Sequence, residues 1–211
     1  MKFEELTSYR KCGHEDVEEL LWVTTDTGAF GNEKDGPLFD WITDKNDFMK
    51  YVKNFDSVIQ AGGNCGMYAR FYKKYFKEVY TFEPDPLNFY CLDRNCVGEG
   101  YHKFQGALGN TTDKLTLNSS NTTNVGVHNI TNKPGDAQMY KIDDINLQKC
   151  DLIHLDVEGY ESTVLAGAIE TISKFKPVII LEKPAISYGI LSMGYVEYKR
   201  GRMDTIFYCD K

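Results

Sequence analysis

The chain has 211 residues, 42% of them hydrophobic and 13% aromatic, which is enough for one domain with a full core. Its formal net charge of -7 argues against a nucleic acid partner, because binding a phosphate backbone requires a basic surface. The sequence contains neither a run of roughly 18 apolar residues nor a secretory signal at its start, so we expect a cytoplasmic protein without a membrane span.

Residues 1–56 precede the first clear strand, and we expect them to form a short helical N-terminal extension. In residues 15–22, apolar side chains recur at i, i+3 and i+4 behind an acidic first turn, which predicts an amphipathic helix. Residues 44–55 again have helical spacing, and the glycine-rich residues 24–38 between the two are predicted to be a loop. The extension could form a lid or substrate wall over the site, and a plain surface connection is the alternative.

Residues 57–86 predict a strand, a glycine turn, a helix and a second strand that ends at an acid. Glycines at a strand end allow a ligand to approach the backbone, and Glu83, 21 positions after Gly62, is placed to bind ribose hydroxyls. The turn GGNCG lacks the G-x-G-x-x-G spacing of a dinucleotide site, which favours a ligand without pyrophosphate. The alternative is an ordinary tight turn of an α/β domain.

A helix over residues 86–97 and a third strand over residues 101–108 are predicted next. The carboxyl end of this strand should lie beside the first two, where Gln105 or nearby backbone groups could contact a base attached to the ribose. The long polar stretch 118–136 is either functional or a mobile hairpin excursion.

Residues 152–157 predict a buried parallel strand, and alternation would place His154, Asp156 and Glu158 on one face. Ionisable groups are costly to bury, so we predict a site at the carboxyl end of this strand. The alternatives are that an acid caps the next helix and that His154 is a satisfied core histidine. A fifth strand over residues 176–182 and two closing strands complete seven, with the last pair antiparallel.

Five sequence blocks carry a resemblance to a known family: VIQAGGNCG, FEPDP, FQGALGN, DLIHLDVEGYESTVLAGA and KPVIILE. In this order and spacing they resemble the FkbM-type family of class I S-adenosylmethionine-dependent methyltransferases. The similarity covers about residues 57–184, whereas the first 56 residues and the polar stretch are unmatched.

The resemblance implies a three-layer, Rossmann-like α/β fold over residues 57–211, with a seven-stranded, mostly parallel sheet and an antiparallel last strand. It implies that S-adenosylmethionine, and the product S-adenosylhomocysteine (SAH), lie along the carboxyl edge of the sheet. The methionine part of the cofactor would contact Gly62, Gly63, Asn64 and Gly66, and its ribose would contact Glu83 and the adjacent Pro84. Its adenine would contact Gln105, Gly106 and Ala107. Asp156 and Glu158 would lie near its methyl group. Gln60 would also contact it, but this family usually has Asp there, so a charge for the amino group of the donor is missing.

The expected reaction is methylation of a hydroxyl on a small molecule, sugar or lipid, and the sequence is silent on which. A hydroxyl needs a general base, for which Asp156 and Glu158 are the first candidates and His154 an outside one. A divalent cation between the acids is an alternative, although six cysteines without a C-x-x-C pair indicate no zinc site. Two other functions stay open: a Rossmann enzyme acting on a nucleotide or nucleotide sugar, and an inactive donor-binding module, which Gln60 slightly favours.

Overall fold

The computed structural model describes residues 2–14, 17–26, 48–119, 128–182, 188–199 and 204–209. Its strands are β1 (Thr7–His14), β2 (Val17–Val23), β3 (Ser57–Ala61), β4 (Glu78–Glu83), β5 (Tyr101–Gln105), β6 (Ala107–Leu108), β7 (Lys114–Ser119), β8 (His128–Pro134), β9 (Ala137–Tyr140), β10 (Leu152–Leu155), β11 (Val178–Glu182), β12 (Val196–Lys199) and β13 (Asp204–Tyr208). Its helices are α2 (Met67–Lys73), α3 (Pro86–Asn95), α4 (Glu161–Ala166), α5 (Ile169–Phe175) and α6 (Tyr188–Ser192), with 3-10 helices η1 (Phe3–Leu6) and η3 (Ile142–Ile145).

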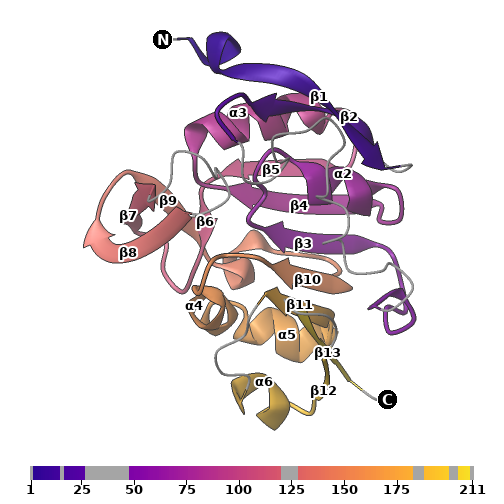
Figure 1. Cartoon of the computed structure of the whole chain (residues 1–211). Coiled ribbons are helices and arrows are strands. Elements are labelled where there is room, and N and C mark those ends of the chain that lie inside the picture. Colours follow the sequence, from indigo (N-terminus) through magenta and orange to yellow (C-terminus); the bar gives the residue numbers. More distant parts are fainter. Residues whose placement is uncertain are drawn as a thin grey trace.

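The central sheet has the strand order β12-β13-β11-β10-β3-β4-β5 (Figure 1). Strands β5, β4, β3, β10 and β11 are parallel to one another, and β13 runs antiparallel to both of its neighbours. The sheet is therefore mixed, and the α/β fold predicted from the sequence is confirmed. Parallel strands end at the same edge, so the carboxyl ends of β3, β4, β5, β10 and β11 meet there.

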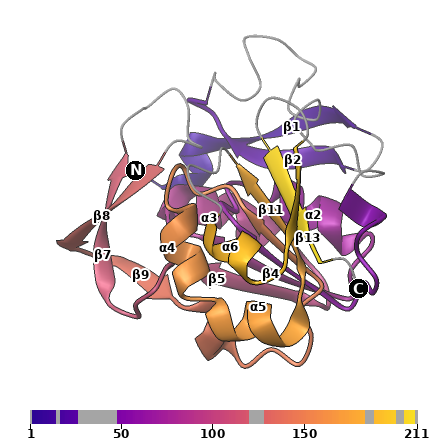
Figure 2. The same ribbon diagram turned by 90° about the horizontal axis from the view of Figure 1, so that it is seen from below.

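Alternate residues of the buried strands face two different helical layers. Val58 belongs to the core cluster that contains Phe71 of α2, whereas its neighbour Ile59 belongs to the cluster that contains Val164 of α4. Figure 2 shows α4, α5 and α6 grouped together, and all three contribute residues to the second cluster. Helices on both faces explain why these strands are apolar without interruption.

Helix α3 begins where the sequence supplies a cap. The carboxylate of Asp85 accepts hydrogen bonds from the backbone N–H groups of Leu87 and Asn88, each at 2.9 Å, and Pro86 occupies the first turn. This cap directly follows Glu83, so it fixes the path of the chain at the carboxyl end of β4.

The helix predicted over residues 15–22 is wrong, because residues 17–23 form strand β2, which pairs antiparallel with β1. The other edge of β2 is also occupied: the side chain of Asn95 accepts from the N–H of Leu21 and donates to its carbonyl, both at 2.8 Å. Leu20 and Trp22 are buried against residues of α2 and α3. Figure 1 shows β2 beside these two helices. These tertiary contacts override the helical spacing.

Other predictions for the N-terminal part lie largely outside the described residues. Residues 27–47 are not described, and they include most of the predicted loop and the start of the helix predicted over residues 44–55. In the described part of that helix, residues 48 and 49 are helical and residues 52–55 are not. The role of the extension as a lid or substrate wall stays a prediction.

The polar stretch 118–136 contains a hairpin. Strands β7 and β8 pair antiparallel, and β7 also pairs with β9, which joins the hairpin to the rest of the molecule through β6. The hairpin projects from one side of the molecule, at the left of Figure 1. The hairpin of the second alternative is therefore present, its mobility stays a prediction, and residues 120–127 lie outside the described part.

No helix within the described ranges is long and apolar enough to cross a membrane.

Candidate functional site

A pocket of about 470 Å³ lies at the carboxyl edge of the central sheet. It is lined by Ala61, Gly62, Phe82, Glu83, Pro84, Ala107, Leu108, Leu117, Ile130, Asp156, Val157, Glu158 and Tyr160. The lining is mostly apolar with three carboxylates, a composition that suits a ligand with a flat apolar part and a few polar groups.

The glycine turn after β3 packs directly against the backbone that follows β10. Gly62 has a φ of +78°, and a Cβ atom on it would lie 1.8 Å from the backbone oxygen of Asp156. The N–H of the next residue, Gly63, donates to the carbonyl of Phe82 at 2.8 Å, which ties the turn to the end of β4. Only glycine fits position 62, because any side chain would collide with the backbone after β10.

Gln60 supports the turn from inside the sheet. Its side-chain amide donates to the carbonyl of Gly62 at 2.9 Å, and its oxygen accepts from the hydroxyl of Thr81 at 2.7 Å. Gln60 is fully buried and does not line the pocket. Its neutral amide therefore holds the backbone at the base of the site, where an aspartate could not donate a hydrogen bond.

Glu83 ends β4 with its carboxyl group on the pocket wall. One carboxyl oxygen accepts from the N–H of Asn64 at 2.6 Å and the other from the N–H of Asp85 at 2.8 Å. Burial raises the pKa of Glu83 to about 8, although these two backbone donors and the side chain of Asn88 favour the charged form. A carboxylate has about four lone-pair sites and these three donors do not use them all, so the charged group can still accept from a ligand.

Three acids converge beyond the end of β10. Leu155 pairs in register with Leu181 of β11, so the residues that follow them, Asp156 and Glu182, lie side by side. Carboxylate oxygens of Asp156, Glu158 and Glu182 lie within 4.8 Å of one another. Burial raises the pKa of Asp156 well above its usual range, and so do its hydrogen bond with Glu182 and the charges of its acidic neighbours.

Such a group of acids can do two things chemically. One carboxyl can keep a proton that it shares with its neighbour, which leaves the other as an unusually strong base. Alternatively, three carboxylates at this spacing can hold a divalent cation. The residues fit either use.

Comparison with known proteins decides the family. The sequence matches the Methyltransferase FkbM domain over residues 60–193, which is more than half of the chain. The chain belongs to the FkbM methyltransferase family. The resemblance found in the five sequence blocks is therefore confirmed, and the matched residues include the glycine turn, Glu83 and the three acids.

Several solved structures that are similar to this FkbM-family chain are described as methyltransferases. The methyltransferase FkbM from Methylobacillus flagellatus superposes with a TM-score of 0.54 at 20% identity, over 72% of this chain and 43% of that one. An rRNA methylase from Streptococcus thermophilus gives a TM-score of 0.47 at 11% identity, over 79% and 95% of the two chains. A Streptococcus mutans protein in complex with SAH gives 0.45 at 10% identity, over 75% and 91%.

The likeness to the Methylobacillus structure supports the fold of the FkbM-family chain and not its substrate. The chain spans less than half the length of the Methylobacillus structure, so what that whole protein does is not transferred to it. The comparison with curated proteins gives no match.

The structure places His154 away from the pocket. Its Nδ1 lies 2.8 Å from the hydroxyl of Tyr72, and the rings of Tyr68 and Tyr72 meet its ring edge-on. Burial lowers the pKa of His154, so the neutral ring is favoured. These contacts favour the alternative of a satisfied core histidine.

Several residues that were predicted to bind the cofactor do not line the pocket. Of the glycine turn, only Gly62 lines the pocket, and Gly63, Asn64 and Gly66 do not. Of the three residues expected near adenine, Ala107 lines it, whereas Gln105 is exposed and Gly106 packs closely against Tyr140. Gln105 pairs with Glu83 in register but does not reach the cavity.

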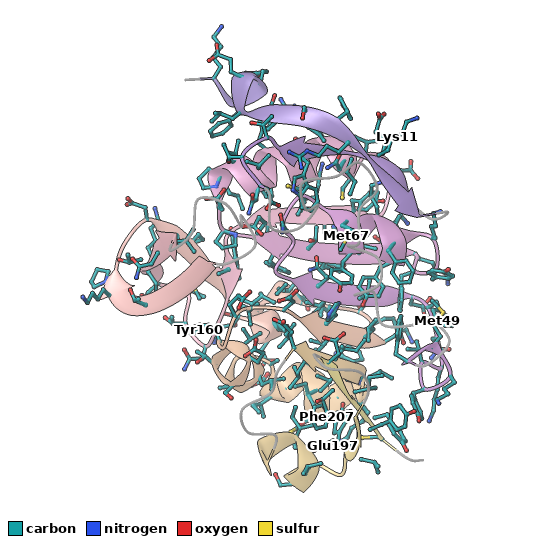
Figure 3. All side chains as sticks on the ribbon, in the orientation of Figure 1. Lys11, Met49, Met67, Tyr160, Glu197 and Phe207 are labelled. Carbon is teal, nitrogen blue, oxygen red and sulfur yellow. The ribbon has the colours of Figure 1, made fainter. Side chains whose placement is uncertain are left out.

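Sequence reasoning missed part of the lining. Leu117 and Ile130 are cross-strand partners in the β7–β8 hairpin, and both line the pocket together with Tyr160. Figure 3 shows Tyr160 on the side of the molecule from which the hairpin projects. Ile130 is an aliphatic residue within the polar stretch 118–136 and Leu117 comes directly before it, and these aliphatic positions were the signal in the sequence. Glu182 is the last residue of β11, the strand beside β10, and the sequence shows it as an acid that ends a predicted strand.

Proposed function

We propose that this FkbM-family protein transfers the methyl group of S-adenosylmethionine to a hydroxyl acceptor. The observation that carries the proposal is that one pocket joins the Gly62 turn, the buried carboxyl of Glu83 and the acids after β10. A donor with a ribose and an apolar base matches this order of groups along the carboxyl edge.

Glu83 would accept hydrogen bonds from the two ribose hydroxyls. Phe82, Ala107 and Leu108 supply apolar surface next to it, which suits the faces of an adenine ring. Asp156 and Gly62, in contact at the other end of the pocket, would lie beside the methionine part. The turn sequence supports a donor without pyrophosphate.

Methyl transfer is a displacement at carbon: the acceptor oxygen forms a bond to the methyl group while the sulfur–carbon bond breaks and its electron pair goes to sulfur. The protein must align the acceptor, exclude water and take up the hydroxyl proton. We assign proton uptake to Asp156, with Glu158 as the second candidate, because both line the pocket. If a divalent cation occupies the three acids, it would lower the pKa of the acceptor hydroxyl.

A second candidate is an inactive donor-binding module. The observation that favours it is that Gln60 offers no charge to the donor, and its amide hydrogen-bonds to Gly62 and Thr81 within the protein.

The acceptor in an active protein would be a small molecule, a sugar or a lipid headgroup that enters beside Tyr160.

The test has two parts. Calorimetric titration should give saturable binding of SAH and none of NAD, and stronger NAD binding would favour a nucleotide enzyme instead. Incubation with isotope-labelled donor and a cell extract should then label a small-molecule product, and Asp156→Asn should lower the rate by about 10²-fold or more. The matched control is Asp144→Asn, which changes an exposed aspartate and should leave the rate unchanged. Binding of SAH without any labelled product would indicate the inactive donor-binding module.

A further inference from the structure

The turn between β10 and α4 carries four residues that line the pocket at the carboxyl edge: Asp156, Val157, Glu158 and Tyr160. The N–H of Tyr160 donates to the carbonyl of Val157 at 3.2 Å, which closes a tight turn. Its two central residues both have a positive φ, +50° at Glu158 and +93° at Gly159. Positive φ at both central positions is the pattern of a type I′ turn.

Glu158 is an unusual residue for the first central position of such a turn. Glycine, asparagine and aspartate dominate there. For other residues the left-handed conformation is unfavourable, because the Cβ atom crowds the following carbonyl oxygen. A residue in a sparsely populated backbone conformation persists only where the surrounding structure holds it. The turn therefore needs restraints from outside its own four residues.

Glu161, the first residue of α4, supplies such a restraint. Its side-chain oxygen Oε1 accepts from the N–H of Gly159 at 3.2 Å and from the N–H of Val157 at 3.4 Å. Glu161 is 5% exposed, so these hydrogen bonds are largely shielded from water. Backbone N–H groups of a turn that converge on one anion form a nest, and here a carboxylate of the protein itself occupies the nest.

The simplest alternative is that Glu161 only stabilises the start of α4. An acid in the first turn of a helix interacts favourably with the helix dipole. That effect requires only proximity to the helix, whereas both N–H groups that Glu161 accepts from belong to the turn before it. Asp143 shows the difference, because its carboxylate accepts from the N–H groups of Glu170 and Thr171, which lie in the first turn of α5.

The two acids of the turn are held by different contacts. The N–H of Asp156 donates to the carbonyl of Ala61 in β3 at 3.1 Å, so its backbone is tied to the sheet. Glu158 lies beyond the end of β10, within the turn that Glu161 restrains. The carboxyl group of Glu158 nevertheless lies within 4.8 Å of those of Asp156 and Glu182. Its place in the pocket therefore depends on the conformation of the turn.

We propose that Glu161 is a positioning residue, which holds the Glu158–Gly159 turn in its left-handed conformation and thereby keeps the Glu158 carboxyl group beside Asp156. The inference rests on the proposed methyl transfer, because it takes Glu158 to contribute to turnover. A displacement of about 1 Å at a reacting group can lower a rate by about 10²-fold. Loss of Glu161 should therefore lower turnover, while Gly62 and Glu83 should still bind the donor.

The first test compares the rate of methyl transfer from saturating labelled donor to a cell extract with the affinity for SAH, measured by calorimetry. Glu161→Ala should lower the rate about tenfold or more and leave the affinity within about twofold. Glu161→Gln keeps an oxygen that can accept both hydrogen bonds, so it should retain most of the rate. Asp143→Ala removes a matched pair of hydrogen bonds at α5 and should change neither quantity.

A double variant separates positioning from a general loss of stability. Glu158→Ala should lower the rate, and adding Glu161→Ala should lower it no further, because the carboxyl group that Glu161 positions is then absent. Hydrogen exchange of residues 156–161, measured by mass spectrometry, should be faster in Glu161→Ala than in the wild type and unchanged in Asp143→Ala. If Glu161→Ala does not fold, Glu161→Asp replaces it throughout, because its shorter side chain cannot reach both N–H groups.

Three results would overturn the inference: unchanged exchange of the turn in Glu161→Ala, an unchanged rate despite faster exchange, or rate losses that multiply in the double variant. A wild type that transfers no methyl group would instead contradict the proposed function. The exchange comparison would then decide by itself whether Glu161 holds the turn.

Discussion

Protonation of Glu83 should control how tightly the protein holds a ribose. Ribose hydroxyls donate hydrogen bonds, so they bind the carboxylate more strongly than the neutral acid. Burial raises the pKa of Glu83 to about 8. A group with this pKa is about one-tenth ionised at pH 7 and about nine-tenths ionised at pH 9, which predicts about tenfold tighter binding at the higher pH.

Methylthioadenosine is the appropriate ligand for this measurement, because it has the adenosine part without the titratable amino acid part of SAH. Calorimetric titration at pH 7, 8 and 9 should give affinities that rise about tenfold for the wild type. Glu83→Gln should bind weakly and independently of pH. Wild-type affinity that stays constant from pH 7 to 9 would refute the assignment of Glu83 to the ribose.

The same group should make the free protein less stable as pH rises. Its pKa is higher in the folded protein than in the unfolded chain, so the folded protein holds more protons between about pH 4.5 and 8, and stability falls through that window. From pH 6 to 9 this amounts to about 2.5 kcal/mol. Glu83→Gln should lose this dependence, at a cost of about 1–3 kcal/mol because its amide cannot accept from both backbone donors.

Three further predictions concern the rest of the pocket. Burial raises the pKa of Asp156 most and Glu182 raises it further, so Glu182→Gln should move the rising limb of the pH–rate profile to lower pH. An unmoved limb would exclude Asp156 as the base. Gly62→Ala should abolish SAH binding and destabilise the fold in chemical denaturation, because its Cβ would collide with the oxygen of Asp156. Gly159→Ala, where φ is +93° but nothing lies within 4 Å, should retain binding, and similar behaviour of the two variants would contradict this reasoning. Leu117→Ala should weaken SAH binding by about 1–2 kcal/mol through lost apolar contact, measured by titration, whereas Leu115→Ala on the same strand, outside the pocket, should not.

Local sequence signals predicted the glycine turn and Glu83 because the glycines and the acid each end a short apolar run of residues. Gly62 has a positive φ, which favours glycine, and Glu83 is the last residue of the buried strand β4. The register of parallel strands then brings both to one edge of the sheet.

Contacts between distant segments explain what the sequence did not reveal. Strand β2 is fixed by β1 and by Asn95, 74 residues away from Leu21, and no periodicity within residues 15–22 reports this. Leu117 and Ile130 reach the pocket because the hairpin folds back through β9 to the sheet edge. Gln105 misses the pocket although it pairs with Glu83 in register, because its side chain is exposed.

The most direct test of the account is a crystal structure of the protein grown with excess SAH. We predict that the two ribose hydroxyls lie within hydrogen-bonding distance of the Glu83 carboxyl group and that the sulfur lies beside Asp156. An empty pocket at saturating SAH, or SAH bound away from Glu83, would contradict it.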